Sequence, residues 1–81
     1  MKIKPLQLDF TIPDYLQEDI DELINYVNEN EDPISIDCYE CQLYATINAT
    51  KNNNRLTQDM ANVLLDYYVF RGWIKTNRKG V

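Results

Sequence analysis

The sequence contains no histidine and few glycines, prolines or cysteines. Its 81 residues include two glycines, three prolines and two cysteines. Without histidine, neither a Ser-His nor a Cys-His catalytic pair can form, and two glycines are too few for a glycine-rich phosphate loop. A tetrahedral zinc site needs four ligands, whereas the chain offers only two thiols. We therefore expect no enzymatic activity, no cofactor and no bound metal.

Long apolar segments are also missing. No run of apolar residues is long enough to span a membrane, and the first residues lack the apolar core found in signal peptides. Two cysteines are too few for the disulfide framework of a small secreted domain. We expect a cytoplasmic protein that has no membrane partner.

The chain does have enough apolar surface for one small core, and its charge is unevenly distributed. Apolar residues make up 44% of the sequence, which indicates a globular fold, and the length predicts a single domain over residues 1–81. Thirteen acidic and eight basic residues give a net charge of −5. Residues 1–40 hold eleven acids and two lysines (−9), whereas residues 41–81 hold two acids and six basic residues (+4). This asymmetry is the main functional clue in the sequence.

The periodicity of apolar residues predicts a mainly α fold, a three-helix domain with a short N-terminal strand or arm. Residues 6–12 alternate between apolar and polar, so residues 1–12 are expected to form a β-strand or an extended arm. Residues 14–30 follow the helical period and predict an amphipathic helix with an acidic outer face. Its expected core residues are Leu16, Ile20, Leu23, Ile24 and Val27.

Residues 36–50 predict a second, central helix. Asp37 is expected to cap it, and Glu40 completes a capping box three residues later. The start of a strand at residues 34–38 is the alternative. Besides one stripe of large apolar residues, this helix carries a second stripe of small ones, which predicts that it packs between two neighbours. The small stripe consists of Cys38, Cys41, Ala45 and Ala49.

A third helix is expected over residues 57–71, capped by Thr57 and ended by Gly72 in the left-handed conformation. Trp73 is expected to pack back against this helix. Residues 73–76 are a candidate short strand that would pair with the N-terminal strand. Residues 77–81 are expected to form a flexible tail.

Several segments between residues 37 and 68 resemble small proteins carried by mobile elements of clostridia and related Firmicutes. The segments are Asp37-Cys38-Tyr39, residues 42–48 (QLYATIN), residues 56–61 (LTQDMA) and Tyr67. Ala45 stands where these proteins tend to have glycine, and residues 64–66 replace a basic stretch. The resemblance implies an origin on a phage, plasmid or conjugative element, and it implies no activity and no site residues.

The acidic face of the first predicted helix is the first candidate site. Residues 14–40 contain ten acids and no basic residue. Like charges one turn apart disfavour a helix by about 0.2–0.5 kcal/mol per pair, so binding to a partner's basic groove is one interpretation and a solvated face is the other. Six acids over about 27 Å supply about 0.2 charge per Å, against about 0.6 for duplex DNA, so this helix alone is a thin mimic of a duplex. The candidate face comprises Asp14, Glu18, Asp21, Glu22, Glu29 and Asp32.

The basic and aromatic C-terminal segment is the alternative site. Cations on either side of an indole would contact phosphates and stack on a base. Against DNA binding, the predicted third helix has no basic residue before Arg71, and the acidic half would repel nucleic acid. The alternative patch comprises Arg55, Arg71, Trp73, Lys75, Arg78 and Lys79.

The pair Cys38 and Cys41 has the spacing of a redox dithiol. Asp37 and Glu40 are immediate neighbours of the two cysteines and disfavour the thiolate. The favoured interpretation is therefore two small, buried, apolar residues.

Together these features predict a small acidic interaction protein from a mobile element. Its expected role is to bind, and to modulate or inhibit, a host nucleic-acid-processing or defence protein through a basic groove of that partner. Anti-CRISPR and anti-restriction proteins are the general type, by size and charge only. A small DNA-associated regulator and an accessory subunit without independent activity are the alternatives, and a homodimer is left open.

Overall fold

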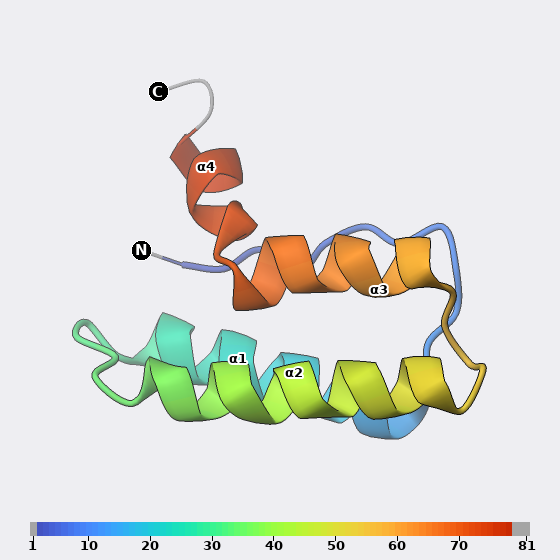
Figure 1. The fold of residues 1–81 in the computed structure, drawn as a ribbon. Coiled ribbons are helices and arrows are strands. Elements are labelled where there is room, and N and C mark those ends of the chain that lie inside the picture. Colours follow the sequence, from blue (N-terminus) through green and yellow to red (C-terminus); the bar gives the residue numbers. More distant parts are fainter. Residues whose placement is uncertain (1, 79–81) are drawn as a thin grey trace.

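The computed structural model is a helical domain preceded by an extended N-terminal arm (Figure 1). It describes the backbone of residues 2–78 and the side chains of residues 2–75. The elements are α1 (Asp14–Glu29), α2 (Ile36–Asn52), α3 (Gln58–Leu64), the π-helical segment η1 (Leu65–Val69) and α4 (Gly72–Arg78). The predicted mainly α fold is confirmed.

The helices form two layers around one core. Helices α1 and α2 lie side by side and antiparallel, and α3, which η1 continues, runs antiparallel to α2 and lies over this layer (Figure 1). The arm runs beside α3, and α4 leaves the end of η1 at a steep angle. This arrangement leaves the outer surface of the α1–α2 layer open to solvent.

Helix α1 follows its sequence pattern closely. All five predicted core residues, from Leu16 to Val27, are buried against α2 and the rest of the core. Pro13 precedes the first turn, and its carbonyl oxygen accepts hydrogen bonds from the amides of Leu16 and Gln17. Pro13 is suited to this position because its fixed φ leads into a helix.

Helix α2 corrects two predictions. Ser35, and not Asp37, occupies the N-cap position, and no side-chain cap is formed there. Helix α2 does pack between α1 and α3 with η1, and Leu43 and Ile47 are buried. All four residues of the small-residue stripe are exposed, however, so that stripe does not form the second packed side. Small side chains offer little apolar area, so leaving them in water sacrifices little burial energy.

The predicted third helix is interrupted by a π-helical turn and by a sharp bend. Thr57 caps α3 as expected, accepting a hydrogen bond from the amide of Met60 at 3.1 Å. Arg71 adopts the left-handed conformation (φ 62°) that was predicted for Gly72. Gly72 is required for a different reason, because a Cβ there would lie 2.6 Å from the carbonyl oxygen of Asp66. Residues 73–76 belong to α4 and form no strand.

The N-terminal arm has the predicted buried face but pairs with no strand in the described part of the chain. Its backbone is held by side chains instead: the amide of Ile3 donates to Asn28 Oδ1 (2.7 Å), and Asn28 Nδ2 donates back to the carbonyl of Ile3. Farther along, the Tyr67 hydroxyl donates to the carbonyl of Lys4, and the amide of Leu6 donates to the Tyr68 hydroxyl. The alternating residues that pack against the core are Leu6, Leu8, Phe10 and Ile12.

The predicted tail at residues 77–81 lies largely outside the described residues. Asn77 and Arg78 continue the backbone of α4. The remaining residues, 79–81, are beyond the described range.

Candidate functional site

The acidic face predicted from the sequence is exposed along α1 and the turn that follows it. All six of its residues are exposed, and none of them takes part in an ion pair within residues 2–75. The apolar side of α1 is buried, so the five acids on this helix lie on its solvent side, and Asp32 lies in the turn that follows. Within the described side chains, the structure therefore presents an exposed acidic face whose members form no ion pair, composed of Asp14, Glu18, Asp21, Glu22, Glu29 and Asp32.

Asp19 has a structural role between α1 and α2. Its carboxylate accepts hydrogen bonds from Gln42 Nε2 at 3.0 Å and from the Thr46 hydroxyl at 2.5 Å, both on α2. These bonds hold α1 and α2 in register beside the acidic face. Asp19 is therefore not part of the free acidic surface.

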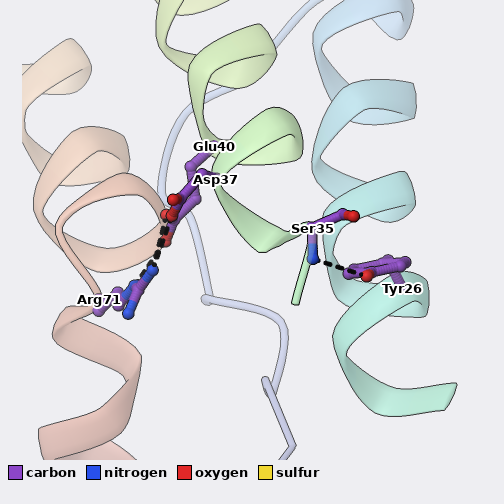
Figure 2. A network of polar contacts seen from close by, with 5 residues as sticks. All are labelled: Tyr26, Ser35, Asp37, Glu40 and Arg71. Carbon is purple, nitrogen blue, oxygen red and sulfur yellow. Dashed lines mark hydrogen bonds and ion pairs between the residues drawn. The ribbon is translucent and has the colours of Figure 1, made fainter. Parts of the chain in front are cut away.

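Two tyrosines meet at the seam between α1 and α2. The rings of Tyr26 and Tyr39 are stacked, with centroids 4.5 Å apart and planes inclined by 19°. The Tyr26 hydroxyl accepts a hydrogen bond from the amide of Ser35 at 3.0 Å, which fixes the ring (Figure 2). Beside the stack is a shallow hollow of about 370 Å³ whose lining includes Glu22 and Glu29.

Sequence reasoning did not identify this tyrosine seam. Glu22, Tyr26 and Glu29 stand at i, i+4 and i+7, which places them on one face of a helix, and this spacing was the available signal. The contribution of Tyr39 had no local signal, because it comes from another helix.

A second polar cluster joins α2 to the end of η1. The guanidinium of Arg71 binds both carboxylate oxygens of Glu40, at 2.9 and 3.1 Å, and Asp37 at 3.2 Å (Figure 2). The hydrogen bond to Glu40 is the main cause that raises the pKa of Arg71. The side chain of Glu40 is only 10% exposed, so this bidentate pair is partly desolvated. Asp37 and Glu40 thus serve this pair and not the predicted capping box.

Among the described side chains, the members of the alternative basic patch do not form a common surface. Arg71 is already paired, and Trp73 is only 3% exposed, so its ring is not available to stack on a base. The indole Nε1 of Trp73 is buried and has no hydrogen-bond partner among the described residues. Arg55 lies in the turn after α2 and Lys75 in α4, at opposite ends of the molecule (Figure 1). The side chains of Arg78 and Lys79 lie outside the described residues.

The cysteine prediction was wrong. Cys38 and Cys41 are both free and both exposed on α2, because their stripe faces solvent. Among the residues that the structure describes, no group of three or more possible metal-ligating side chains comes together.

An apolar hollow of about 480 Å³ lies on the other side of α2, against η1. Its lining combines Cys41, Tyr44, Val69 and Phe70 with the paired acids of the Arg71 cluster. Phe70, which lines this hollow, is 63% exposed. The hollow brings no set of convergent polar groups together, so it has no recognisable catalytic arrangement.

The fold and the exposed surface define a small helical domain with an unpaired acidic face. No family model matches the chain, and comparisons with curated proteins and with solved structures give no match either. In the part of the chain that the structure describes, no helix has the length and apolar character required to cross a membrane.

Proposed function

We propose that this protein is a small, non-enzymatic interaction module that binds a basic surface of a partner protein through the acidic face of α1. The observation that carries the proposal is the unpaired state of that face. Arg71 pairs with Asp37 and Glu40, whereas the six face residues have no cationic partner among the described side chains. A partner's lysines or arginines would supply the missing countercharge.

Charge supports the partner class: proteins that process nucleic acid present basic grooves, which an acidic face would complement. The mobile-element origin implied by the resemblance would make a host nucleic-acid-processing or defence protein the target. The protein would then act in the cytoplasm as a modulator or inhibitor encoded by a mobile element. Its charge density, about 0.2 per Å, favours occupation of part of a groove over replacement of a whole duplex.

The spatial arrangement disfavours the DNA-regulator alternative. DNA binding requires a basic footprint, whereas among the described side chains Arg71 is paired and Arg55 and Lys75 lie at opposite ends of the molecule (Figure 1). An accessory-subunit role and a homodimer have no observation in their favour beyond the exposed apolar hollow beside Phe70.

The test is to identify the partner with two charge-matched variants. The test variant carries Glu18→Gln, Asp21→Asn and Glu22→Gln, and the control variant neutralises three exposed acids elsewhere. The control changes are Asp9→Asn, Asp59→Asn and Asp66→Asn. Tagged protein is used to capture partners from the host cell, and each captured protein is then purified and its affinity measured directly.

We expect the test variant to lose at least tenfold in affinity and the control to lose less than about twofold, because only the test variant changes the α1 face. Equal losses in both variants would contradict the proposal. Retention of duplex DNA by the unaltered protein, with a steep dependence on salt, would favour the DNA-regulator alternative instead.

A further inference from the structure

The hollow beside the tyrosine seam combines an aromatic platform with two carboxylates. Tyr26 and Tyr39 are both partly exposed, and no basic side chain lines the hollow between them and the two glutamates. Glu22 and Glu29 are two helical turns apart on α1, about 10 Å along its axis, and Tyr26 lies between them. The carboxylates therefore flank the aromatic pair on both sides.

Tyr39 is also accessible from its other side. A second hollow, of about 410 Å³, is lined by Glu22, Ser35, Cys38, Tyr39 and Gln42. Tyr39 and Glu22 are common to both hollows. The side chain of Tyr39 thus lies between the two hollows, with the carboxylate of Glu22 lining both.

The seam is held in place before any partner binds. The stack fixes the two rings against each other, and the Ser35 amide fixes the Tyr26 hydroxyl. Asp19 joins α1 to α2 through Gln42 and Thr46 close by. A preorganised site loses less side-chain entropy on binding.

We propose that this seam is the recognition site for an arginine side chain of the partner. The inference rests on the proposed function and adds the chemistry of one contact. A planar guanidinium stacks on a tyrosine ring and donates two parallel hydrogen bonds to a carboxylate, whereas the ammonium of lysine is a point charge that cannot do both. Arginine would lie on Tyr39 and bind Glu22, and a second basic residue about 10 Å away would reach Glu29.

The experiment uses two synthetic peptides that differ only in having arginine or lysine at every basic position. Each peptide is titrated into the folded protein at low salt, and amide chemical shifts report both the affinity and the location. The unaltered protein should bind the arginine peptide about two- to fivefold more tightly. The largest shifts should fall in residues 22–29 and 35–42.

Two ring variants isolate the contribution of the aromatic platform. Tyr39→Phe retains the ring and should keep the arginine preference, whereas Tyr39→Leu should reduce the affinity ratio of the two peptides to about one. The amide spectrum of each variant verifies that it is folded. A preference that persists in folded Tyr39→Leu would overturn the proposal.

Charge variants distinguish failure of this site from failure of the proposed function. Glu22→Gln with Glu29→Gln should weaken binding of both peptides, and Asp59→Asn with Asp66→Asn should not. If the peptides bind equally well but the α1 variant weakens both, the arginine site is wrong and the acidic interaction face stands. If neither peptide binds, or both pairs of substitutions have the same effect, the arginine site and the α1 face are both wrong.

Discussion

Arg71 is the residue at which backbone conformation and electrostatics are most clearly coupled. Its φ of 62° lies in the left-handed region, which costs a non-glycine residue about 1 kcal/mol. The bidentate bond to Glu40 holds the side chain where this backbone conformation directs it. The chain can therefore leave η1 and begin α4 at a sharp angle with a non-glycine residue in the left-handed conformation, followed by Gly72, which has no Cβ to clash with Asp66.

Removing the guanidinium should destabilise the protein more than removing its exposed partner. Arg71→Met leaves Glu40, a largely buried carboxylate, without a cation, and should lower the free energy of unfolding by about 1–2 kcal/mol. Asp37 is 83% exposed, so Asp37→Asn should cost about 0.5 kcal/mol or less. Urea denaturation at neutral pH measures both values. Equal losses would show that burial of Glu40 does not set the strength of this pair.

Two buried tyrosines predict a loss of stability at alkaline pH. Burial raises the pKa of Tyr67 and, as the largest of several causes, the pKa of Tyr68. The unfolded chain therefore releases these protons at a lower pH, near 10, than the folded protein does. The corresponding stability is complete below about pH 10 and decreases as the pH rises toward the folded-state values.

The urea concentration at the midpoint of unfolding should therefore decrease as the pH is raised above about 10. Tyr68→Phe should reduce this decrease, although it also removes the acceptor for the Leu6 amide and lowers stability at neutral pH. Tyr15→Phe is the control, because Tyr15 is exposed and, like Tyr68, loses one hydrogen bond in the variant, the one to the Thr50 hydroxyl. A pH dependence that is unchanged in Tyr68→Phe would argue against Tyr68 as a source.

Among the elements, the N-terminal arm shows how an extended segment can be held without a sheet. Alternation in residues 6–12 correctly indicated which side chains turn toward the core. The described arm pairs with no strand, and four of its backbone groups, at residues 3–6, bond to the side chains of Asn28, Tyr67 and Tyr68. Polar side chains of α1 and η1 thus do for the arm what a neighbouring strand does within a sheet.

The double hydrogen bond between Asn28 and Ile3 should be the main attachment of the start of the arm. Asn28→Ala removes both bonds and should lower the free energy of unfolding by about 1–2 kcal/mol. It should also increase hydrogen exchange at the Ile3 amide. Asn25→Ala, at an exposed position of the same helix, is the matched control and should leave exchange at Ile3 unchanged. Unaltered protection of Ile3 in Asn28→Ala would mean that apolar packing alone holds the arm.

At the scale of the whole molecule, charge is separated into a paired region and an unpaired one. The described ion pairs both involve Arg71, at the junction of α2 and η1, while the α1 face has only carboxylates. Like charges on one helix oppose folding slightly. Asp14 in the first turn of α1 and the hydrogen bond from Gln17 to Asp21 stabilise the helix, but they do not account for the other acids of the face.

Neutralising part of this face should leave the protein as stable as before, or more stable. Glu18→Gln, Asp21→Asn and Glu22→Gln together bring the formal net charge from −5 to −2. They should raise the free energy of unfolding by up to about 0.5 kcal/mol at low salt, and the gain should shrink as salt screens the repulsion. Thermal melts at two salt concentrations measure this. A loss of more than about 1 kcal/mol would assign the acids a structural role.

The sequence by itself determined the features that depend on local periodicity. The core residues of α1, the Thr57 cap and the inward side of the arm were all predictable, because each depends on neighbours within one or two turns. The exposure of the α1 acids follows from the same pattern, since one side of an amphipathic helix must face water.

Only the tertiary structure decided which distant side chains meet. The bond between Arg71 and Glu40 joins residues 31 positions apart. Because of it, Arg71, which the sequence pattern placed in a basic patch, is neutralised by a carboxylate. The exposure of Cys38 and Cys41 and the stack of Tyr26 on Tyr39 depend on which side of α2 the other helices cover. That choice is made by the packing of the whole core, so it has no signature in the spacing of residues along one helix.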